Sequence, residues 1–223
     1  MQLVAPAGNV AALKAAVNNG ADAVYLGMPQ FGARAKAQNF GCDEFASAVE
    51  YAHLFGTKVF VTLNTLIKDG EMQAALDAAK HAYEHGADAA IVQDIRFIKL
   101  LKRELPELTL HASTQMGIHN ADGARAVLDI GISRAVLARE PLPEDIAEIK
   151  KTGIDIEFFV QGALCICFSG NCYFSSLASS YSGNRGRCMQ LCRKKYDFHG
   201  KSGYFLSAKD ICLYGKLDRL NEL

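Results

Sequence analysis

The sequence feature that most constrains the fold is a recurring unit: an alanine-rich amphipathic segment, a glycine and a short apolar run. The glycines of five such units are Gly20, Gly56, Gly86, Gly131 and Gly153. A glycine just after a helix readily adopts the left-handed conformation that turns the chain back. The apolar runs are continuous rather than alternating, as in strands covered on both faces. The pattern therefore predicts an α/β protein with a parallel sheet.

Seven strands are expected from this pattern, at residues 2–5, 23–26, 58–63, 89–93, 109–113, 134–138 and 155–160. A TIM-like (β/α) barrel has eight strands and typically takes about 250 residues, whereas this chain has 223. We therefore expect residues 1–223 to form a single (β/α)-barrel domain, truncated before its last strand and incomplete at its C-terminus. A doubly wound open sheet is the alternative, but the chain has no GxGxxG phosphate turn.

The end of the chain carries two further expectations. Residues 194–210 are expected to form a hairpin insertion around His199 and Gly200 rather than a barrel strand. A seven-stranded barrel would expose two unpaired strand edges, whose free backbone groups favour pairing with other chains. Self-association, or a missing C-terminal segment or domain, is therefore expected.

The composition is typical of a soluble protein from a reducing compartment. Half of the residues are hydrophobic and the formal net charge is zero, so no overall field favours a membrane or nucleic acid. No apolar stretch is long enough to cross a bilayer, and the first residues do not resemble a secretory leader. Seven cysteines in such a chain indicate metal ligands or buried thiols more than disulfides, which predicts a cytoplasmic location.

Polar residues follow several of the expected strands. In a barrel, the C-terminal ends of the strands and the loops after them build the active face. A structural role, in which such side chains only hydrogen-bond the loops, is the alternative for each of them. The candidate catalytic residues on this face are Asn64, Gln93, Asp94, Gln115, Arg139 and Glu140.

Six of the seven cysteines fall between residues 165 and 212, and five of them lie in residues 162–196, after the seventh strand. This segment is rich in Gly, Ser and Asn and has too few apolar residues to pack alone. Because thiolates favour zinc and iron–sulfur clusters, residues 162–196 are predicted to form a metal loop. Only Cys188-x3-Cys192 fits the paired knuckles of a zinc ribbon, which favours a cluster over zinc. Buried thiols without a metal are the alternative.

A basic strip overlaps the cysteines, since residues 185–201 hold six cations and one acid, Asp197. RNA phosphates would suit this strip, and Tyr181 and Tyr196 would suit stacking on unpaired bases. A solvated basic loop is the alternative. Lys201 ends the strip, and the candidate substrate-binding residues are Arg34, Arg185, Arg187, Arg193, Lys194 and Lys195.

Other catalytic patterns are weak. His81 and His85 have the i, i+4 spacing of a metal pair, but a solvated helix face is the expected reading. Ser113, His119 and Asp94 are a possible nucleophilic set at the mouth of the barrel, although many other triples would serve equally. The chain has no GxSxG and no HExxH motif.

The segment EFFVQGALCICFSGNCYFSS, from Glu157 to Ser176, resembles the signature of the collagenase-like peptidase family, originally classed as peptidases of unknown mechanism. The segments MQLVAPAGNVAALKAAVNNGADAVYLG, KVFVTLNTL, IVQD, HASTQM and VLARE are similar to that family's barrel motifs, in the same order. The resemblance covers essentially the whole chain. The family's next motif, a Lys-Ile-Glu-Gly-Arg-like run, is absent, which is consistent with a truncated barrel.

The resemblance implies a protein of oxygen-independent hydroxylation that binds a 4Fe–4S cluster through four cysteines of the loop. Such proteins act on ribosomal RNA, transfer RNA or a quinone precursor. Cys212 is the substitute if one ligand is wrong, while Cys42 and Cys167 match no ligand position. Carried over by position, the implied ligands are Cys165, Cys172, Cys188 and Cys192.

The sequence leaves three hypotheses for the function of this chain. The leading hypothesis is iron–sulfur-dependent hydroxylation of a base in RNA. The second is a peptidase, which the family name implies but no nucleophile–base set or metal-bound water motif supports. The third is a binding module that carries a cluster or zinc and has no catalytic activity.

Overall fold

The computed structural model describes residues 1–163, 165–204 and 211–212 of the chain. Seven parallel strands form one sheet whose order follows the sequence, from β1 to β7. Their bounds are β1 (Val4–Ala7), β2 (Ala23–Gly27), β3 (Lys58–Leu63), β4 (Ala89–Val92), β5 (Leu110–Ala112), β6 (Arg134–Val136) and β7 (Asp155–Glu157). All seven expected strands are confirmed, although β1 begins two residues later than expected and β7 ends three residues earlier.

The sheet curls into a half-barrel. The order of its strands never reverses, as it would at the switch point of a doubly wound sheet. Side chains meet across the curl: Arg134 of β6 donates a hydrogen bond to Gln2, just before β1, at 3.2 Å. Its guanidinium also lies 5.5 Å from the ring centre of Phe60 in β3. The predicted barrel-type α/β fold is therefore confirmed, while the missing eighth strand stays a prediction.

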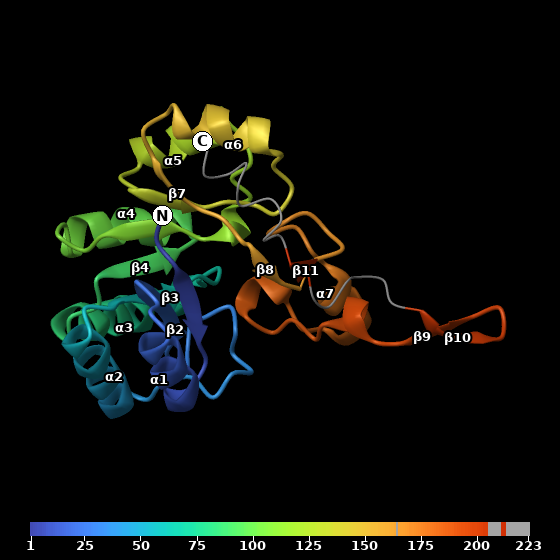
Figure 1. Ribbon diagram of the computed structural model, residues 1–223, viewed down its shortest axis with the longest axis horizontal. Coiled ribbons are helices and arrows are strands. Elements are labelled where there is room, and N and C mark those ends of the chain that lie inside the picture. Colours follow the sequence, from blue (N-terminus) through green and yellow to red (C-terminus); the bar gives the residue numbers. More distant parts are fainter. Residues whose placement is uncertain (164, 205–210, 213–223) are drawn as a thin grey trace.

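Six helices connect successive strands and cover the outside of the curl (Figure 1). They are α1 (Val10–Asn18), α2 (Cys42–Leu54), α3 (Met72–Glu84), α4 (Ile95–Glu104), α5 (Ala121–Asp129) and α6 (Pro143–Lys150). Asparagine or aspartate side chains cap three of them, because Asn9, Asp94 and Asn120 each accept a hydrogen bond from a first-turn amide. The five glycines singled out in the sequence all have φ between +74° and +87°. None of the described helices is both long and apolar enough to cross a membrane.

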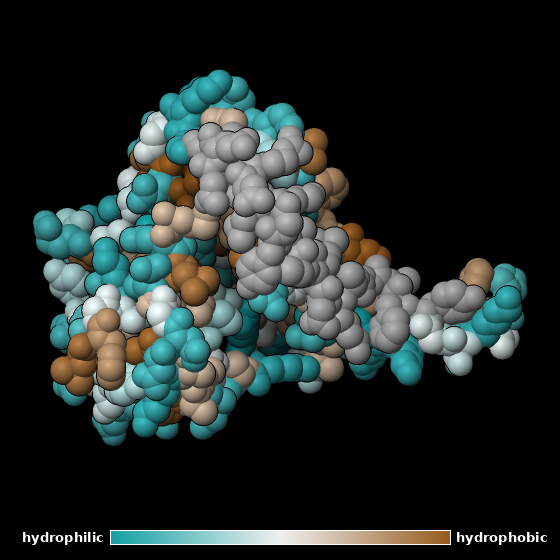
Figure 2. Space-filling model, viewed as in Figure 1, coloured by the Kyte–Doolittle hydropathy of each residue, from teal (hydrophilic) through white to brown (hydrophobic). Residues whose placement is uncertain are grey.

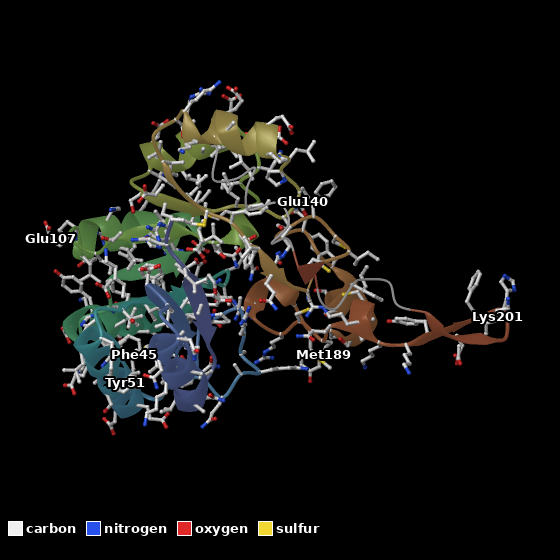
Figure 3. The ribbon with its side chains drawn as sticks, in the orientation of Figure 1. Phe45, Tyr51, Glu107, Glu140, Met189 and Lys201 are labelled. Carbon is white, nitrogen blue, oxygen red and sulfur yellow. The ribbon has the colours of Figure 1, made fainter. Side chains whose placement is uncertain are left out.

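The core has an outer and an inner part. The outer part joins the helices to the sheet and includes the fully buried Phe45 and Phe97, of which Phe45 is labelled in Figure 3. Its apolar burial is the main term that stabilises the fold. The inner part lies within the curl and contains Ala23, Phe60, Ala89 and Ile91. These strands are therefore buried on both faces, as their continuous apolar runs predict.

A hairpin follows the cysteines and extends away from the body of the molecule (Figure 1). Its antiparallel strands are β9 (Tyr196–Phe198) and β10 (Lys201–Tyr204), joined by the two residues His199 and Gly200. Both linking residues have positive φ, 48° and 72°, which is the requirement of a type I′ hairpin turn. The sequence predicts a hairpin here, and residues 205–210 of that expectation lie outside the described residues.

A buried histidine inside the curl makes the stability of the barrel depend on pH. His111 in β5 is 4% exposed, and its ring packs edge-on against Phe60 with 4.7 Å between the ring centres. Burial, followed by the charges of Arg134 and Lys58, lowers the pKa of His111 from 6.5 to about 3. The folded barrel therefore holds this ring neutral at pH values where the unfolded chain would protonate it.

We expect the free energy of unfolding to fall as the pH drops from 6.5 toward 3, because the unfolded chain binds a proton that the barrel excludes. One such proton changes stability by up to about 1.4 kcal/mol per pH unit. Between pH 6.5 and about 5, the parent should lose about 1.6 kcal/mol more than His111→Gln. Urea denaturation of both proteins at several pH values measures this difference, and parallel pH profiles would contradict it.

Candidate metal centre

The cysteine-rich loop, residues 162–196, leaves the seventh strand and crosses the C-terminal edge of the sheet. It begins in β8 (Gln161–Gly162), which pairs with β11 (Ile211–Cys212) in antiparallel fashion. It then contains one short helix, α7 (Phe174–Ser179), and the single turns η3 (Gly183–Arg185) and η4 (Leu191–Arg193). Little of this segment is regular structure, so contacts with the barrel decide its position.

The five cysteines of this loop influence one another electrostatically and therefore lie in one region. Burial raises the pKa of Cys167, and so do the adjacent thiol of Cys172 and the thiols of Cys192 and Cys165. Burial also raises the pKa of Cys192; Arg193 opposes this shift, and Cys165, Cys188 and Cys172 add to it. The four expected ligands thus lie in the same region of the loop as Cys167, and their role as metal ligands stays a prediction. Cys42 instead begins α2.

The donor set consists of thiols, which are ligands of both zinc and iron–sulfur clusters. The thiol sulfur of Cys188 accepts a hydrogen bond from the backbone N–H of Gln190 at 3.4 Å and faces the Ser175 hydroxyl at 4.0 Å. Hydrogen bonds to cysteine sulfurs are a recurrent feature of iron–sulfur sites, where they tune the reduction potential. Among the described residues, no three metal-binding side chains converge on a single point.

One end of the loop is anchored on the mouth of the barrel by a close backbone contact. Gly170 has φ +80°, and a Cβ at this position would lie 2.0 Å from the carbonyl oxygen of Gln115. The preceding Ser169 donates its N–H to the carboxylate of Glu140 at 3.0 Å, and its hydroxyl accepts the N–H of Arg139 at 3.3 Å. Only glycine at position 170 allows these two segments of the backbone to approach so closely.

A second anchor lies at η3. The carbonyl oxygen of Asn184 accepts hydrogen bonds from the side chain of Gln93 and the N–H of Leu66, both at 3.1 Å. Arg185 forms a two-pronged ion pair with Glu71 at 2.7 and 3.0 Å. The hydrogen bond from Arg185 is the largest cause that lowers the pKa of Glu71 to about 2. This pair therefore persists over the whole physiological pH range.

The amides predicted to be catalytic meet at the mouth, beneath this loop. Asn64 and Gln93 are 9% and 8% exposed. Asn64 donates a hydrogen bond to the hydroxyl of Ser113 at 3.0 Å and accepts one from the N–H of Ala33 at 2.9 Å. Gln93 donates to the carbonyl of Asn64 at 2.8 Å and faces the side chain of Gln115 at 3.4 Å. These side chains join three strand ends and the loop into one network.

The remaining predicted catalytic residues take separate positions. Asp94 caps α4 through the N–H of Phe97 and accepts the N–H of Ile67, so both carboxylate oxygens are occupied. The Glu140 carboxylate, labelled in Figure 3, serves the loop anchor. The Arg139 guanidinium lies 4.3 Å from the ring centre of Phe159. A catalytic role for each of these residues stays a prediction.

The predicted substrate-binding cations fall into three groups. Arg185 is tied to Glu71, and Arg34 is tied to Tyr25, to whose hydroxyl it donates at 2.9 Å. Arg187 and Lys195 are exposed. The third group, Arg193 and Lys194, lines a pocket.

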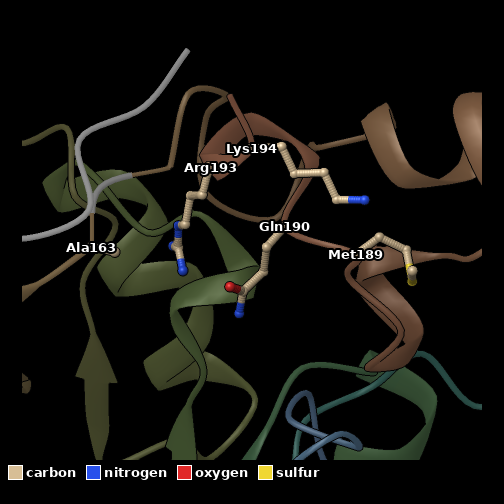
Figure 4. A pocket seen from close by; sticks show the side chains of 5 residues that line it. All are labelled: Ala163, Met189, Gln190, Arg193 and Lys194. Carbon is tan, nitrogen blue, oxygen red and sulfur yellow. The ribbon is translucent and has the colours of Figure 1, made fainter. Parts of the chain in front are cut away.

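This pocket of about 440 Å³ is bounded by Ala163, Met189, Gln190, Arg193 and Lys194 (Figure 4). The buried Nε of Arg193 has no partner among the described residues. Lys36 reaches the sulfur of Met189 at 3.0 Å and joins the loop after β2 to this region. Sequence reasoning missed the pocket because Gln190 and Ala163 carry no recognisable pattern.

Residues 8–223 match the profile described as Peptidase family U32. The chain belongs to this family. It is 41% identical over 93% of its length to the 23S rRNA 5-hydroxycytidine C2501 synthase of Escherichia coli, covering 31% of that protein. It is 38% identical over 97% of its length to tRNA hydroxylation protein P1 of Bacillus subtilis, covering 51%. A Porphyromonas gingivalis protein named Collagenase is 32% identical over 94% of the chain, which covers 55% of it.

The chain thus spans from about a third to about half of these curated relatives. Among solved structures, the U32 peptidase Mk0906 matches with a TM-score of 0.58 at 16% identity, over 71% of this chain and 67% of that one. A glycerophosphodiester phosphodiesterase from Parabacteroides distasonis has a TM-score of 0.52 at 12% identity, over 71% and 84%. At these identities the likeness shows the barrel fold alone.

Replacing Gly170 by alanine should detach the first anchor of the loop, because the new Cβ would strike the carbonyl of Gln115. Gly153→Ala is the matched control, since Gly153 has φ +85° and open space around it. The control carries only the backbone strain of about 1 kcal/mol. We expect faster amide hydrogen exchange across the cysteine-rich loop in Gly170→Ala alone. Equal exchange in the two variants would contradict the anchor.

Proposed function

We propose that this chain is the barrel part of an RNA hydroxylation enzyme that depends on a 4Fe–4S cluster held by the cysteine-rich loop. The observation that carries the proposal is a gathered set of thiols, docked over a barrel mouth, in a chain 41% identical to an rRNA 5-hydroxycytidine synthase. The proposal concerns this part of a longer kind of protein, since the relatives extend well beyond the matched region.

The proposed ligands are Cys165, Cys172, Cys188 and Cys192. Cys212 is the alternative for one of them, because the pairing of β11 with β8 puts its backbone opposite Gln161, near the start of the loop. A cluster held by these residues would supply redox chemistry. Zinc is the alternative metal, and with zinc the same loop would serve as a binding module without redox activity.

The protein's own contribution is to position the loop and the RNA. The hydrogen bonds of Gln93 and the ion pair of Arg185 fix the loop, and with it the thiols, above the mouth. Arg193 and Lys194 offer a cationic pocket to a phosphate group beside those thiols. An enzyme that modifies a base must take that base out of its stack, which suits an unpaired nucleotide placed at this pocket.

A peptidase is the second candidate, since relatives carry the names Collagenase and Uncharacterized protease. The side chains of the possible nucleophilic set, Ser113, His119 and Asp94, form hydrogen bonds with other groups. The Ser113 hydroxyl accepts from Asn64, the His119 ring contacts the carbonyl of Gly117 at 2.7 Å, and Asp94 caps a helix. These contacts favour hydroxylation over an acyl-transfer mechanism. Proteolysis that survives replacement of every loop cysteine would reverse this preference.

Single replacement of a proposed ligand by serine should greatly lower cluster loading, because a serine hydroxyl deprotonates much less readily than a thiol and is a poorer ligand for iron. Anaerobic purification followed by iron and sulfide counts and an absorption spectrum measures the loading. Cys42→Ser and Cys167→Ser are the controls and should retain the cluster. Full loading of Cys192→Ser together with loss in Cys212→Ser would transfer the fourth position to Cys212. Zinc without sulfide in the parent would make the chain a zinc protein.

Neutralising Arg187, Lys194 and Lys195 together, as glutamines, should weaken RNA binding and flatten its dependence on salt. Removing one phosphate-binding cation lowers the slope of log affinity against log salt by about 0.7 to 0.9. The expected change for three cations is therefore about 2.1 to 2.7. The matched control neutralises three cations of the outer helices, Lys14, Lys99 and Arg103. Titrations of a transfer RNA at several salt concentrations test this, and equal slopes in both triple variants would contradict an RNA role for the strip.

A further inference from the structure

The hairpin β9–β10 with the two lysines before it, residues 194–204, forms an arm that extends from the cysteine-rich loop (Figure 1). A two-stranded hairpin is only marginally stable in water by itself. The arm owes its shape to local chemistry: the turn at His199 and Gly200, and the Tyr196 hydroxyl, which donates to the carbonyl of Leu191 at 2.9 Å. An element of this kind contributes little to the core.

Among the side chains of the arm whose exposure the structure describes, Phe198 is the most exposed large aromatic. Phe198 is 64% exposed, and the His199 ring lies edge-on to it with 4.3 Å between the ring centres. The surrounding surface is cationic, because Lys194, Lys195 and Lys201 are all exposed. Figure 2 shows hydrophilic residues beside a smaller apolar patch at the far end of the arm, and Lys201 is labelled there in Figure 3.

The strand register sorts these side chains onto two faces. Phe198 and Lys201 are directly opposite each other in the antiparallel ladder, so their side chains share one face with Cβ atoms about 5 Å apart. Asp197, which is next to Phe198 in β9, projects from the other face. The acid of the arm is thereby separated from the aromatic–cation pair.

We propose that the Phe198–Lys201 face of the arm binds an unpaired nucleotide of RNA, with its base stacked on Phe198 and its phosphate near Lys201. An exposed ring beside a cation is the combination that holds single-stranded nucleic acid, since every base offers a face for stacking. RNA is favoured over a protein partner because the arm carries three lysines and one acid in a chain of zero net charge. The inference rests on the proposed function. It adds a second RNA-binding surface, outside the cysteine-rich loop's proposed metal site.

The test compares an RNA stem–loop carrying 2-aminopurine in its loop with a fully paired duplex of the same stem, both titrated with the full chain by fluorescence. Phe198→Leu keeps an apolar side chain and removes the ring. It should bind the stem–loop about tenfold more weakly, the usual size of one stacking contact. Phe198→Trp should restore both the affinity and the quenching of 2-aminopurine. Duplex binding should be the same in all three proteins.

The control is Phe55→Leu, because Phe55 is 59% exposed at the end of α2, far from the arm in Figure 1. It should match the parent on both RNAs. If the parent binds the stem–loop and Phe198→Leu shows the same affinity and quenching, nucleotide binding by the arm is contradicted. The proposed function is unaffected by that result. Equal losses on stem–loop and duplex would also overturn stacking. A parent that binds neither RNA would remove the proposed function itself.

Discussion

The contact between Gly170 and the carbonyl of Gln115 is the constraint on which the candidate site depends. Two backbones approach there more closely than any side chain would permit, and the loop that carries the thiols starts its path over the mouth at this point. The ion pair of Arg185 with Glu71 holds the other side of the loop. Cys172 lies between these anchors, while the other four cysteines of the loop lie just before the first anchor or just after the second, mostly outside regular structure. The contacts between the loop and the barrel therefore determine how the cysteines are placed relative to one another.

The parallel sheet is what makes such anchoring possible. Every strand of a half-barrel ends at the same edge, so polar residues that follow different strands become neighbours. Asn64, Gln93 and Ser113 follow β3, β4 and β5, and their hydrogen bonds link those three strand ends. Their side chains are buried polar groups with partners, which costs little and fixes geometry. The mouth is therefore a rigid platform on which an irregular loop can be held in one place.

The sequence predicts the regular part of this molecule well, because each helix–glycine–strand unit is local. The five glycines, the seven strands and the turn at His199 are all visible in short windows of residues. The site is less predictable because its partners are distant in sequence. Arg185 is a plausible phosphate-binding residue by charge alone, and only the fold brings Glu71, 114 residues earlier, to its guanidinium. Similarly, the sequence predicts that Asp94 is a catalytic acid at the mouth of the barrel, whereas in the structure its side chain caps α4.

The same distances set an order of events as the protein folds. Gln93 and Glu71 precede their partners Asn184 and Arg185 by 91 and 114 residues, so closing these contacts carries a loop-closure cost that local contacts avoid. We therefore expect the helices and neighbouring strands to form first, and the cysteine-rich loop to dock after β3, β4 and the turn before α3 are in place. Until that moment the thiols of the loop would remain accessible. In the proposed metal site, loading of the metal would then be timed by these long-range contacts.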